Sequence, residues 1–134
     1  MKGLLFPSPL FFLSPSSLFP PSPFPADIVV SGIMVIAEIT VTPLGTGSPS
    51  LSKYVAACAK VLNESGLNHT LTPMGSVIEG TLDQILEVIR KVHSVPFSQG
   101  AQRVSTRIVI DERRDKDVTG KDKIQSVQSK LAGQ

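Results

Sequence analysis

Residues 35–42 carry the sequence VIAEITVT, in which two kinds of position alternate. One set is apolar throughout and the other is mostly polar: Val35, Ala37, Ile39 and Val41 alternate with Ile36, Glu38, Thr40 and Thr42. A period of two places successive side chains on opposite faces of an extended chain. The pattern predicts a half-buried strand that begins near Met34 and ends at Pro43.

A turn and a helix are expected next. The turn is the glycine-rich segment 45–49. Behind it, apolar residues recur at the spacing of one helical face: Leu51, Val55, Cys58, Ala59 and Leu62. This stripe predicts an amphipathic helix, and Gly66 is expected to cap it just past its end.

Two more strands and a second helix are predicted over residues 67–96. The second strand spans residues 67–74, and a short third strand follows Gly75 at residues 76–79. Thr81 and Gln84 have the spacing of a capping box. They precede a helical stripe that Pro96 is expected to stop: Leu82, Ile85, Leu86, Ile89 and Val92.

Residues 103–110 alternate again and predict a fourth strand, and a short terminal helix is expected from near Thr119. The order strand, helix, strand, strand, helix, strand predicts an α+β fold, the ferredoxin-like βαββαβ plait. It has a four-stranded antiparallel sheet with both helices on one face, here with an added C-terminal helix. This domain is expected to span residues 34–134.

The other face of the predicted sheet is polar. Ala37, Ile39, Thr106 and Ile108 are expected to point at the helices, and Glu38, Thr40, Thr42, Ser105 and Arg107 to point away from them. The first and fourth strands are neighbours in this fold, so the outward residues of the two strands should lie close together. Such a face is either solvated or covered by another subunit.

Residues 1–33 differ in composition from the rest of the chain. Seven of the 11 prolines and five of the six phenylalanines lie in the first 25 residues. Alternating Pro, Ser, Leu and Phe has no period that could bury one face, so a disordered leader is expected. We hypothesise that Met34 is the true initiator and that residues 1–33 are not translated; the alternative is a targeting peptide.

Charge and cysteine content exclude several classes of protein. The formal net charge of +2 is too small to create a strong field for nucleic acid or an anionic membrane surface. The single cysteine, Cys58, rules out an internal disulfide framework and fits a reducing compartment, so a cytoplasmic location is expected. With only two histidines, the chain lacks the ligands of a structural zinc site, and no metal is expected.

Two segments could carry binding chemistry. The turn at residues 45–50 lies between a strand and a helix, where backbone amides can receive an anion; the alternative is a tight turn with Ser48 or Ser50 as helix cap. Glu79 lies between Gly75 and Gly80 and could bind a cationic or amino-bearing ligand; the alternative is a solvent-exposed strand end.

The remaining reactive side chains favour structural roles. His69 and His93 lie on different elements and are expected to be surface or partly buried structural residues. Cys58 lies on the apolar helix face and is expected in the core. The run 111–123 holds five basic and five acidic residues, which predicts a solvated turn with internal ion pairs.

Three blocks of sequence resemble the thiamine-binding-protein family. They are residues 37–47 (AEITVTPLGTG), 71–80 (LTPMGSVIEG) and 100–116 (GAQRVSTRIVIDERRDK). The resemblance covers residues 34 to about 131. It implies a ferredoxin-like fold that assembles into homodimers or homotetramers through the sheets, and binding of thiamine or a related pyrimidine.

The resemblance also suggests which residues would hold such a ligand. Thiamine carries a positive thiazolium ring and an aminopyrimidine, so a site needs charge, hydrogen-bonding groups and an apolar surface. The candidate ligand-binding residues are Glu38, Thr42, Thr46, Met74, Glu79 and Ser105. No cofactor is expected, apart from thiamine as a bound ligand.

The leading hypothesis is a homo-oligomer that binds thiamine or its hydroxymethylpyrimidine moiety without catalysis, with no nucleic-acid or membrane partner. A structural or regulatory protein-interaction module is the alternative. An enzyme on the same fold is a third hypothesis, because one fold hosts many chemistries. No nucleophile with a partnered base is evident in the sequence.

Overall fold

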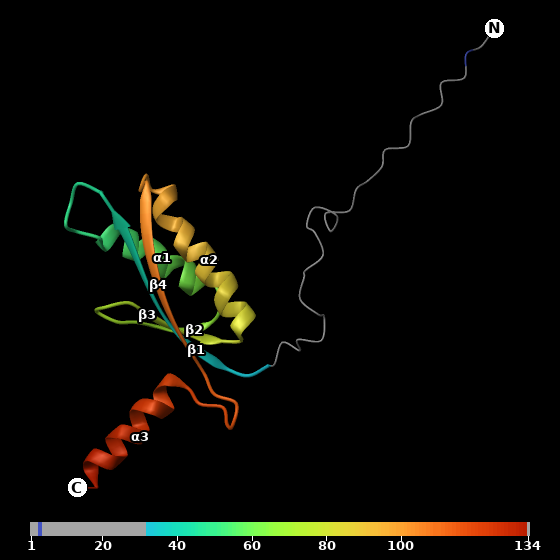
Figure 1. Cartoon of the computed structure of the whole chain (residues 1–134), viewed down its shortest axis with the longest axis vertical. Coiled ribbons are helices and arrows are strands. Elements are labelled where there is room, and N and C mark those ends of the chain that lie inside the picture. The colour runs from blue at the N-terminus through green and yellow to red at the C-terminus, as the bar shows by residue number, and fades with distance from the viewer. Residues whose placement is uncertain (1–2, 4–31, 134) are drawn as a thin grey trace.

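The computed structural model describes residue 3 and residues 32–133 (Figure 1). The predicted leader at residues 1–33 therefore lies almost entirely outside the described residues. The described elements are β1 (Val35–Leu44), α1 (Ser52–Glu64), β2 (Asn68–Leu71), β3 (Ser76–Gly80), α2 (Leu82–Ser98), β4 (Arg103–Glu112) and α3 (Gly120–Ala132).

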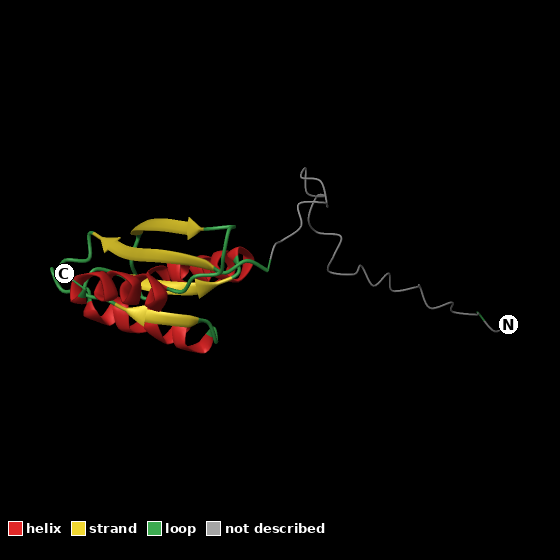
Figure 2. Ribbon diagram, turned by 90° about the horizontal axis from the view of Figure 1, so that it is seen from below, coloured by secondary structure: helices red, strands yellow, loops and turns green. Residues whose placement is uncertain are grey.

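The four strands form one antiparallel sheet in the order β2-β3-β1-β4. Figure 2 shows them as one layer with helices beside it. This order and the βαββαβ sequence of elements confirm the α+β, ferredoxin-like plait, and α3 is the predicted C-terminal helix.

The core lies between one face of the sheet and helices α1 and α2. Ala37 of β1 pairs with Ile78 of β3, and both side chains are fully buried. Their partners across the core come from both helices: Cys58 and Leu62 of α1, and Ile85, Val88, Ile89 and Val92 of α2. The opposite face of the sheet, which we call the open face, carries the alternate residues of each strand.

The outward residues of β1 and β4 lie beside one another as predicted. Thr40 pairs with Arg107, and Thr42 pairs with Ser105. On the helix side of the sheet, the Thr106 hydroxyl and Nδ1 of His93 on α2 form a hydrogen bond at 2.7 Å. The predicted assignment of residues to the two faces is therefore confirmed.

Strand β1 continues through Pro43, where it was expected to end. The β1–β3 ladder stops at Ile39 and Ser76, and a Cβ on Gly75 would meet the Ile39 carbonyl oxygen at 2.8 Å. Ile39 thus directs its backbone groups towards β3. Because alternate residues of a strand direct their backbone groups to the same side, Pro43 faces the same way, beyond the end of β3. Its missing N–H falls on an unpaired edge, where proline is tolerated.

The predicted second strand is shorter than expected. The backbone N–H of Thr72 donates to the Gly75 carbonyl at 2.8 Å, and the Thr72 hydroxyl donates to the same carbonyl at 2.9 Å. These two hydrogen bonds close a turn over residues 72–75, which contains Pro73, so β2 ends at Leu71.

Helix α2 also runs past the proline that was expected to stop it. Pro96 is buried inside the helix, and it cannot donate to the carbonyl of Val92 four residues earlier. The thiol of Cys58 on α1 donates to that carbonyl at 3.8 Å. Helix packing thus satisfies the acceptor that proline leaves free.

The predicted caps have mixed outcomes. The Thr81–Gln84 capping box is confirmed, and so is Gly66, which has a positive φ of 73° just past α1. Neither Ser48 nor Ser50 caps α1, whose N-cap is Leu51 with no side-chain hydrogen bond. The Ser48 hydroxyl instead accepts from the backbone N–H of Ser50 at 3.1 Å, within the turn that precedes the helix.

Helix α3 begins after Thr119 as predicted and lies apart from α1 and α2 (Figure 1). None of its residues is buried. Across residues 32–133, no helix is long and apolar enough to cross a membrane.

Candidate ligand-binding site

The unequal lengths of two paired strands create a pocket. Strand β1 has 10 residues, whereas its neighbour β3 has five. Beyond Ile39, one edge of β1 therefore faces the turn at residues 72–75 instead of a strand. Helix α1 covers this gap, and the result is a cavity of about 270 Å³.

Every residue that lines this cavity, which we call the neutral pocket, is uncharged. The walls come from Ile39–Thr42 of β1, from Leu51, Val55, Cys58 and Leu62 in or next to α1, from residues 71–76 and from Val92 of α2. Most of this surface is apolar, and Thr40, Thr42, Thr72 and Ser76 are among the polar residues that line it. Such a composition suits an uncharged organic ring with a few polar substituents.

The turn at the mouth of the pocket is held by side-chain hydrogen bonds. The Thr72 hydroxyl accepts from the backbone N–H groups of Met74 and Gly75, and the Thr40 hydroxyl donates to the Met74 carbonyl at 3.2 Å. Gly75 has no space for a side chain against β1. The turn is therefore a fixed wall, while the Met74 side chain remains 81% exposed at its rim.

Two of the six predicted ligand residues, Thr42 and Met74, line the neutral pocket. Glu38 and Ser105 lie on the open face, as Thr42 does, but they do not line the pocket. Ser105 is the cross-strand partner of Thr42, whereas exposed Glu38 sits between Val77 of β3 and Val109 of β4.

Thr46 belongs to a different surface hollow at the start of α1, lined by Thr46, Ser48, Ser50 and residues 52–54. Its hydroxyl donates to the Ser48 carbonyl at 3.1 Å. The hydrogen bond supports the turn alternative for this glycine-rich segment.

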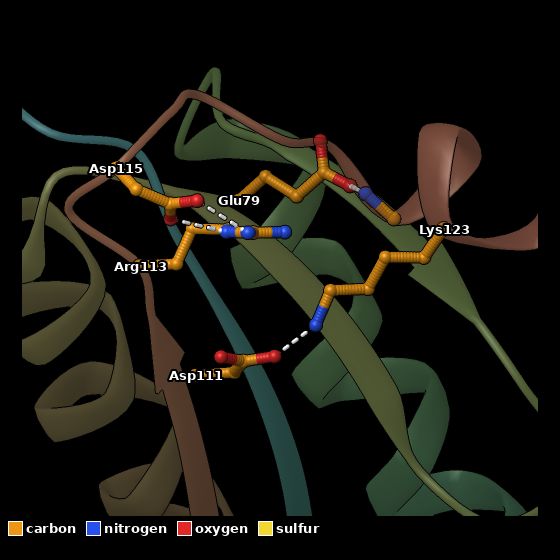
Figure 3. A network of polar contacts seen from close by, with 6 residues as sticks. Glu79, Asp111, Arg113, Asp115 and Lys123 are labelled. Atoms are coloured by element: carbon orange, nitrogen blue, oxygen red, sulfur yellow. Dashed lines mark hydrogen bonds and ion pairs between the residues drawn. The ribbon is translucent and has the colours of Figure 1, made fainter. Parts of the chain in front are cut away.

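Glu79 has a structural environment that neither sequence alternative anticipated. It is only 8% exposed, so it is not a solvated strand end. One carboxylate oxygen accepts from the Asn68 side chain and the other from the backbone N–H of Gly120, both at 2.7 Å. Glu79 thus joins β2 and β3 to the first residue of α3. Figure 3 shows Glu79 with the charged side chains around the start of this helix.

The charged turn before α3 is internally paired as predicted. Arg113 donates two hydrogen bonds to Asp115, and this contact lowers the pKa of the Asp115 carboxyl. Lys123 on α3 pairs with Asp111 at the end of β4 (Figure 3). These contacts and Glu79 hold the start of α3 at one end of the sheet.

The reactive side chains have structural partners. His69 hydrogen-bonds the Leu67 carbonyl and Asn63, and His93 contacts Thr106 and packs edge-on against Phe97. Cys58 is buried as predicted, and burial raises the pKa of its thiol. Among the described residues, no group of three or more metal-binding side chains occurs.

Comparison with known proteins identifies the family. Residues 37–128 match the family model described as thiamine-binding protein. The chain belongs to the thiamine-binding protein family. The UPF0045 protein YqgV of Bacillus subtilis is 45% identical over 102 residues, which cover 73% of this chain and 98% of the relative. A UPF0045 protein of Methanothermobacter thermautotrophicus is 40% identical over 99 residues, which cover 73% and 100%.

Solved structures share the fold. The hypothetical protein MJ1052 of Methanocaldococcus jannaschii is 36% identical, with a TM-score of 0.65 over 71% of this chain and 96% of that one. A Thermotoga maritima protein described as a candidate for thiamine biosynthesis or salvage has a TM-score of 0.60 over 70% of this chain and 98% of that one. At 17% identity, the second comparison shows the fold alone.

In this member of the family, two of the three resembling blocks meet at the neutral pocket. The block at residues 37–47 supplies the β1 wall, and the block at 71–80 supplies the turn and Ser76. The third block forms β4 and the charged turn, away from the pocket.

Sequence reasoning missed the α1 side of this site. Leu51, Val55 and Cys58 were assigned to a helix stripe, and stripe residues pack in the core by default. The structure leaves Val55 of this stripe 39% exposed at the pocket. The sequence carried no signal of this, because periodicity does not distinguish a packed position from one that faces a cavity.

Proposed function

We propose that this protein binds thiamine, or its hydroxymethylpyrimidine moiety, in the neutral pocket and does so without catalysing a reaction. The observation that carries the proposal is the pocket itself. It forms beside α1 where two of the blocks that resemble the family, residues 37–47 and 71–80, meet. Membership of a family named for thiamine binding supports the choice of ligand.

The pocket walls offer suitable contacts for a substituted ring. Leu51 and Val55 present apolar surface, and the Met74 thioether can adapt to the ring edge. The hydroxyls of Thr42 and Ser76 can donate to or accept from ring substituents.

The environments of the reactive groups favour binding over catalysis. Cys58, the single cysteine of the chain, lines the pocket. Burial raises the pKa of its thiol, and the thiol donates a hydrogen bond to the Val92 carbonyl. A buried thiol in this state is a poor nucleophile. A free thiol also fits the reducing cytoplasm, which we propose as the location.

We further propose that the protein is a homodimer or homotetramer assembled through the sheet. Strand β4 is an edge strand, and its Ile108, Val109 and Ile110 are 40–46% exposed. A long edge with exposed apolar residues is suited to pairing with another copy.

Isothermal titration calorimetry of the full chain with thiamine and with hydroxymethylpyrimidine tests the ligand proposal. Val55→Phe should fill the neutral pocket and weaken binding tenfold or more, equivalent to about 1.4 kcal/mol. Ala56→Phe is the matched control, because Ala56 is an exposed neighbour on α1 outside the pocket lining. Absence of heat and of any thermal shift at millimolar ligand would contradict the proposal.

A second candidate function, a protein-interaction module, is favoured by one feature. Ile124, Val127 and Leu131 form an apolar stripe along α3 and are 58–66% exposed. A 13-residue helix without buried residues gains little stability from its own chain, so a partner surface would stabilise it.

A further inference from the structure

A second cavity lies between α3 and the open face of β2 and β3. Its volume is about 460 Å³, and its lining is mostly apolar, with Val77 contributed by β3 and Ile124 by α3. Among the described residues, Thr72 is the one that lines both this cavity and the neutral pocket. The α3 cavity, as we call it, is therefore a separate space, and its volume falls in the range of about 300–1,000 Å³ that is usual for small-molecule sites.

Glu79 brings a buried negative charge to this cavity. The residue lines the cavity and is only 8% exposed. Its two hydrogen-bond donors, the Asn68 amide and the Gly120 N–H, are uncharged, and within residues 32–133 no ion pair includes Glu79. The N-terminus of α3 supplies only about half a positive charge. Because a buried charge is usually paired with a full opposite charge, Glu79 is placed to bind a cationic group.

The carboxylate of Glu79 has capacity for further donors. Its two oxygens together offer about four acceptor positions, and in the structure each oxygen accepts one hydrogen bond. A primary ammonium has three N–H donors, and hydrogen bonds between oppositely charged groups are stronger than those between neutral groups. An ammonium ligand would therefore fill the free acceptor positions and balance the charge.

Lys121 adds a positive charge to the same lining. It is exposed, and it forms no ion pair within the described part of the chain. This lysine would repel a simple cation, whereas it would attract a ligand that also carries a carboxylate. Gln125 and Gln128, neighbours on one face of α3, line the cavity as well and offer amide donors and acceptors. The charges of the lining therefore favour a zwitterion.

We propose that the α3 cavity binds an α-amino acid with an apolar side chain. The ammonium group would donate to Glu79, and the carboxylate of the ligand would face Lys121. The apolar side chain would lie between Val77 and Ile124. This site would be additional to the neutral pocket and would not require a ligand there.

Isothermal titration calorimetry of the full chain with L-phenylalanine tests the site. L-Phenylalanine should bind at millimolar concentration, and glycine, which lacks the apolar side chain, should bind about tenfold or more weakly. 3-Phenylpropionate, which lacks the ammonium, should give no heat, because its carboxylate would face Glu79. Phenethylamine, which lacks the carboxylate, should bind roughly threefold more weakly, because an ion pair to an exposed lysine contributes little.

Substitutions locate the binding in the α3 cavity. Ile124→Trp should fill the cavity and weaken phenylalanine binding about tenfold or more, and the fold should tolerate this change because Ile124 is 61% exposed. Leu131→Trp is the matched control, since Leu131 is an exposed apolar residue of the same helix outside the cavity lining. Glu79→Gln keeps an acceptor oxygen but removes the charge, so it should also weaken binding about tenfold or more, with circular dichroism to verify the fold.

Several results would overturn the proposal. They are the absence of heat with L-phenylalanine, equal binding of 3-phenylpropionate, and unchanged phenylalanine binding by Ile124→Trp. Phenethylamine that binds as tightly as L-phenylalanine would overturn the assignment of a zwitterion. Titration of the same protein with thiamine tests the neutral pocket separately, so either proposal can fail while the other stands.

Discussion

Glu79 illustrates how one buried carboxylate can organise three elements. Asn68 on β2 and Gly120 at the start of α3 both donate to it, and it stands on β3. Gly120 has little room for a side chain, since an added Cβ would lie 2.9 Å from the carboxylate. Because both of its oxygens are hydrogen-bonded, Glu79 acts as a structural anchor. The negative charge of a carboxylate at this position also interacts favourably with the positive end of the α3 dipole.

Replacing this anchor should destabilise the fold. Glu79→Ala leaves the Asn68 amide and the Gly120 N–H without their acceptor, so we expect the free energy of unfolding to fall by about 1–3 kcal/mol. Urea denaturation followed by circular dichroism measures this change. Glu87→Ala on exposed α2 surface is the control and should change it by less than about 0.5 kcal/mol. An equal effect of the two substitutions would show that Glu79 is not an anchor.

At the scale of elements, α3 depends on its own ends more than on packing. Thr119 and Asp122 form a capping box, and Lys123 pairs with Asp111. The Asp122 carboxylate accepts from the Thr119 backbone N–H and hydroxyl, and these hydrogen bonds lower the pKa of Asp122.

Acid should therefore loosen the first turn of α3. Because the pKa of Asp122 in the folded protein lies below that of the unfolded chain, its stabilisation is complete above the ordinary aspartate pKa of about 3.9 and is lost as the pH falls through the lowered value. Backbone chemical shifts of residues 119–123, followed from pH 6 to pH 2, measure this loss.

Asp122→Asn serves as the comparison for that titration, because it removes the ionisable group. Its first-turn shifts should lack the acid transition of the native protein. A native first turn that keeps its shifts after Asp122 is protonated would contradict the role given to this carboxylate.

For the whole molecule, the open face and the β4 edge are the surfaces on which assembly would depend. Val109 lies on the open face of β4 and is 46% exposed. Val127, on the apolar stripe of α3, is also exposed, so the two valines represent the two candidate interfaces.

A lysine placed in the interface that holds the protein chains together should dissociate the oligomer, because burying an unpaired charge is costly. We expect Val109→Lys to reduce the mass measured by light scattering to that of a single chain, with unchanged circular dichroism. Val127→Lys should leave the mass unaltered. The reverse result would place the interface on α3 and favour the protein-interaction function.

The plait and its element order were predictable because they depend on patterns within a few residues. Alternation in residues 35–42 and the Thr81–Gln84 box require only neighbouring positions, and both predictions were confirmed. The errors occurred where a distant partner decides. Pro43 stays in its strand because β3 is short, and Pro96 stays in α2 while a thiol from α1 donates to Val92.

The site follows the same division. Thr42 and Met74 could be placed near a ligand because they lie in the family-like blocks, but their spacing along the chain does not reveal what they face. Glu79 lies in one of those blocks as well, yet tertiary contacts from Asn68 and α3 occupy its oxygens.

Local chemistry thus determined the elements of this protein: the alternation of its strands, the stripes and capping boxes of its helices, and the family to which its blocks belong. Only the tertiary structure decided where the β1–β3 ladder stops and which residues α1 brings over the gap. The physical reason is that a pocket is space left between elements. The shape of that space depends on the relative lengths and packing of the elements. Residues that are distant in the chain determine both.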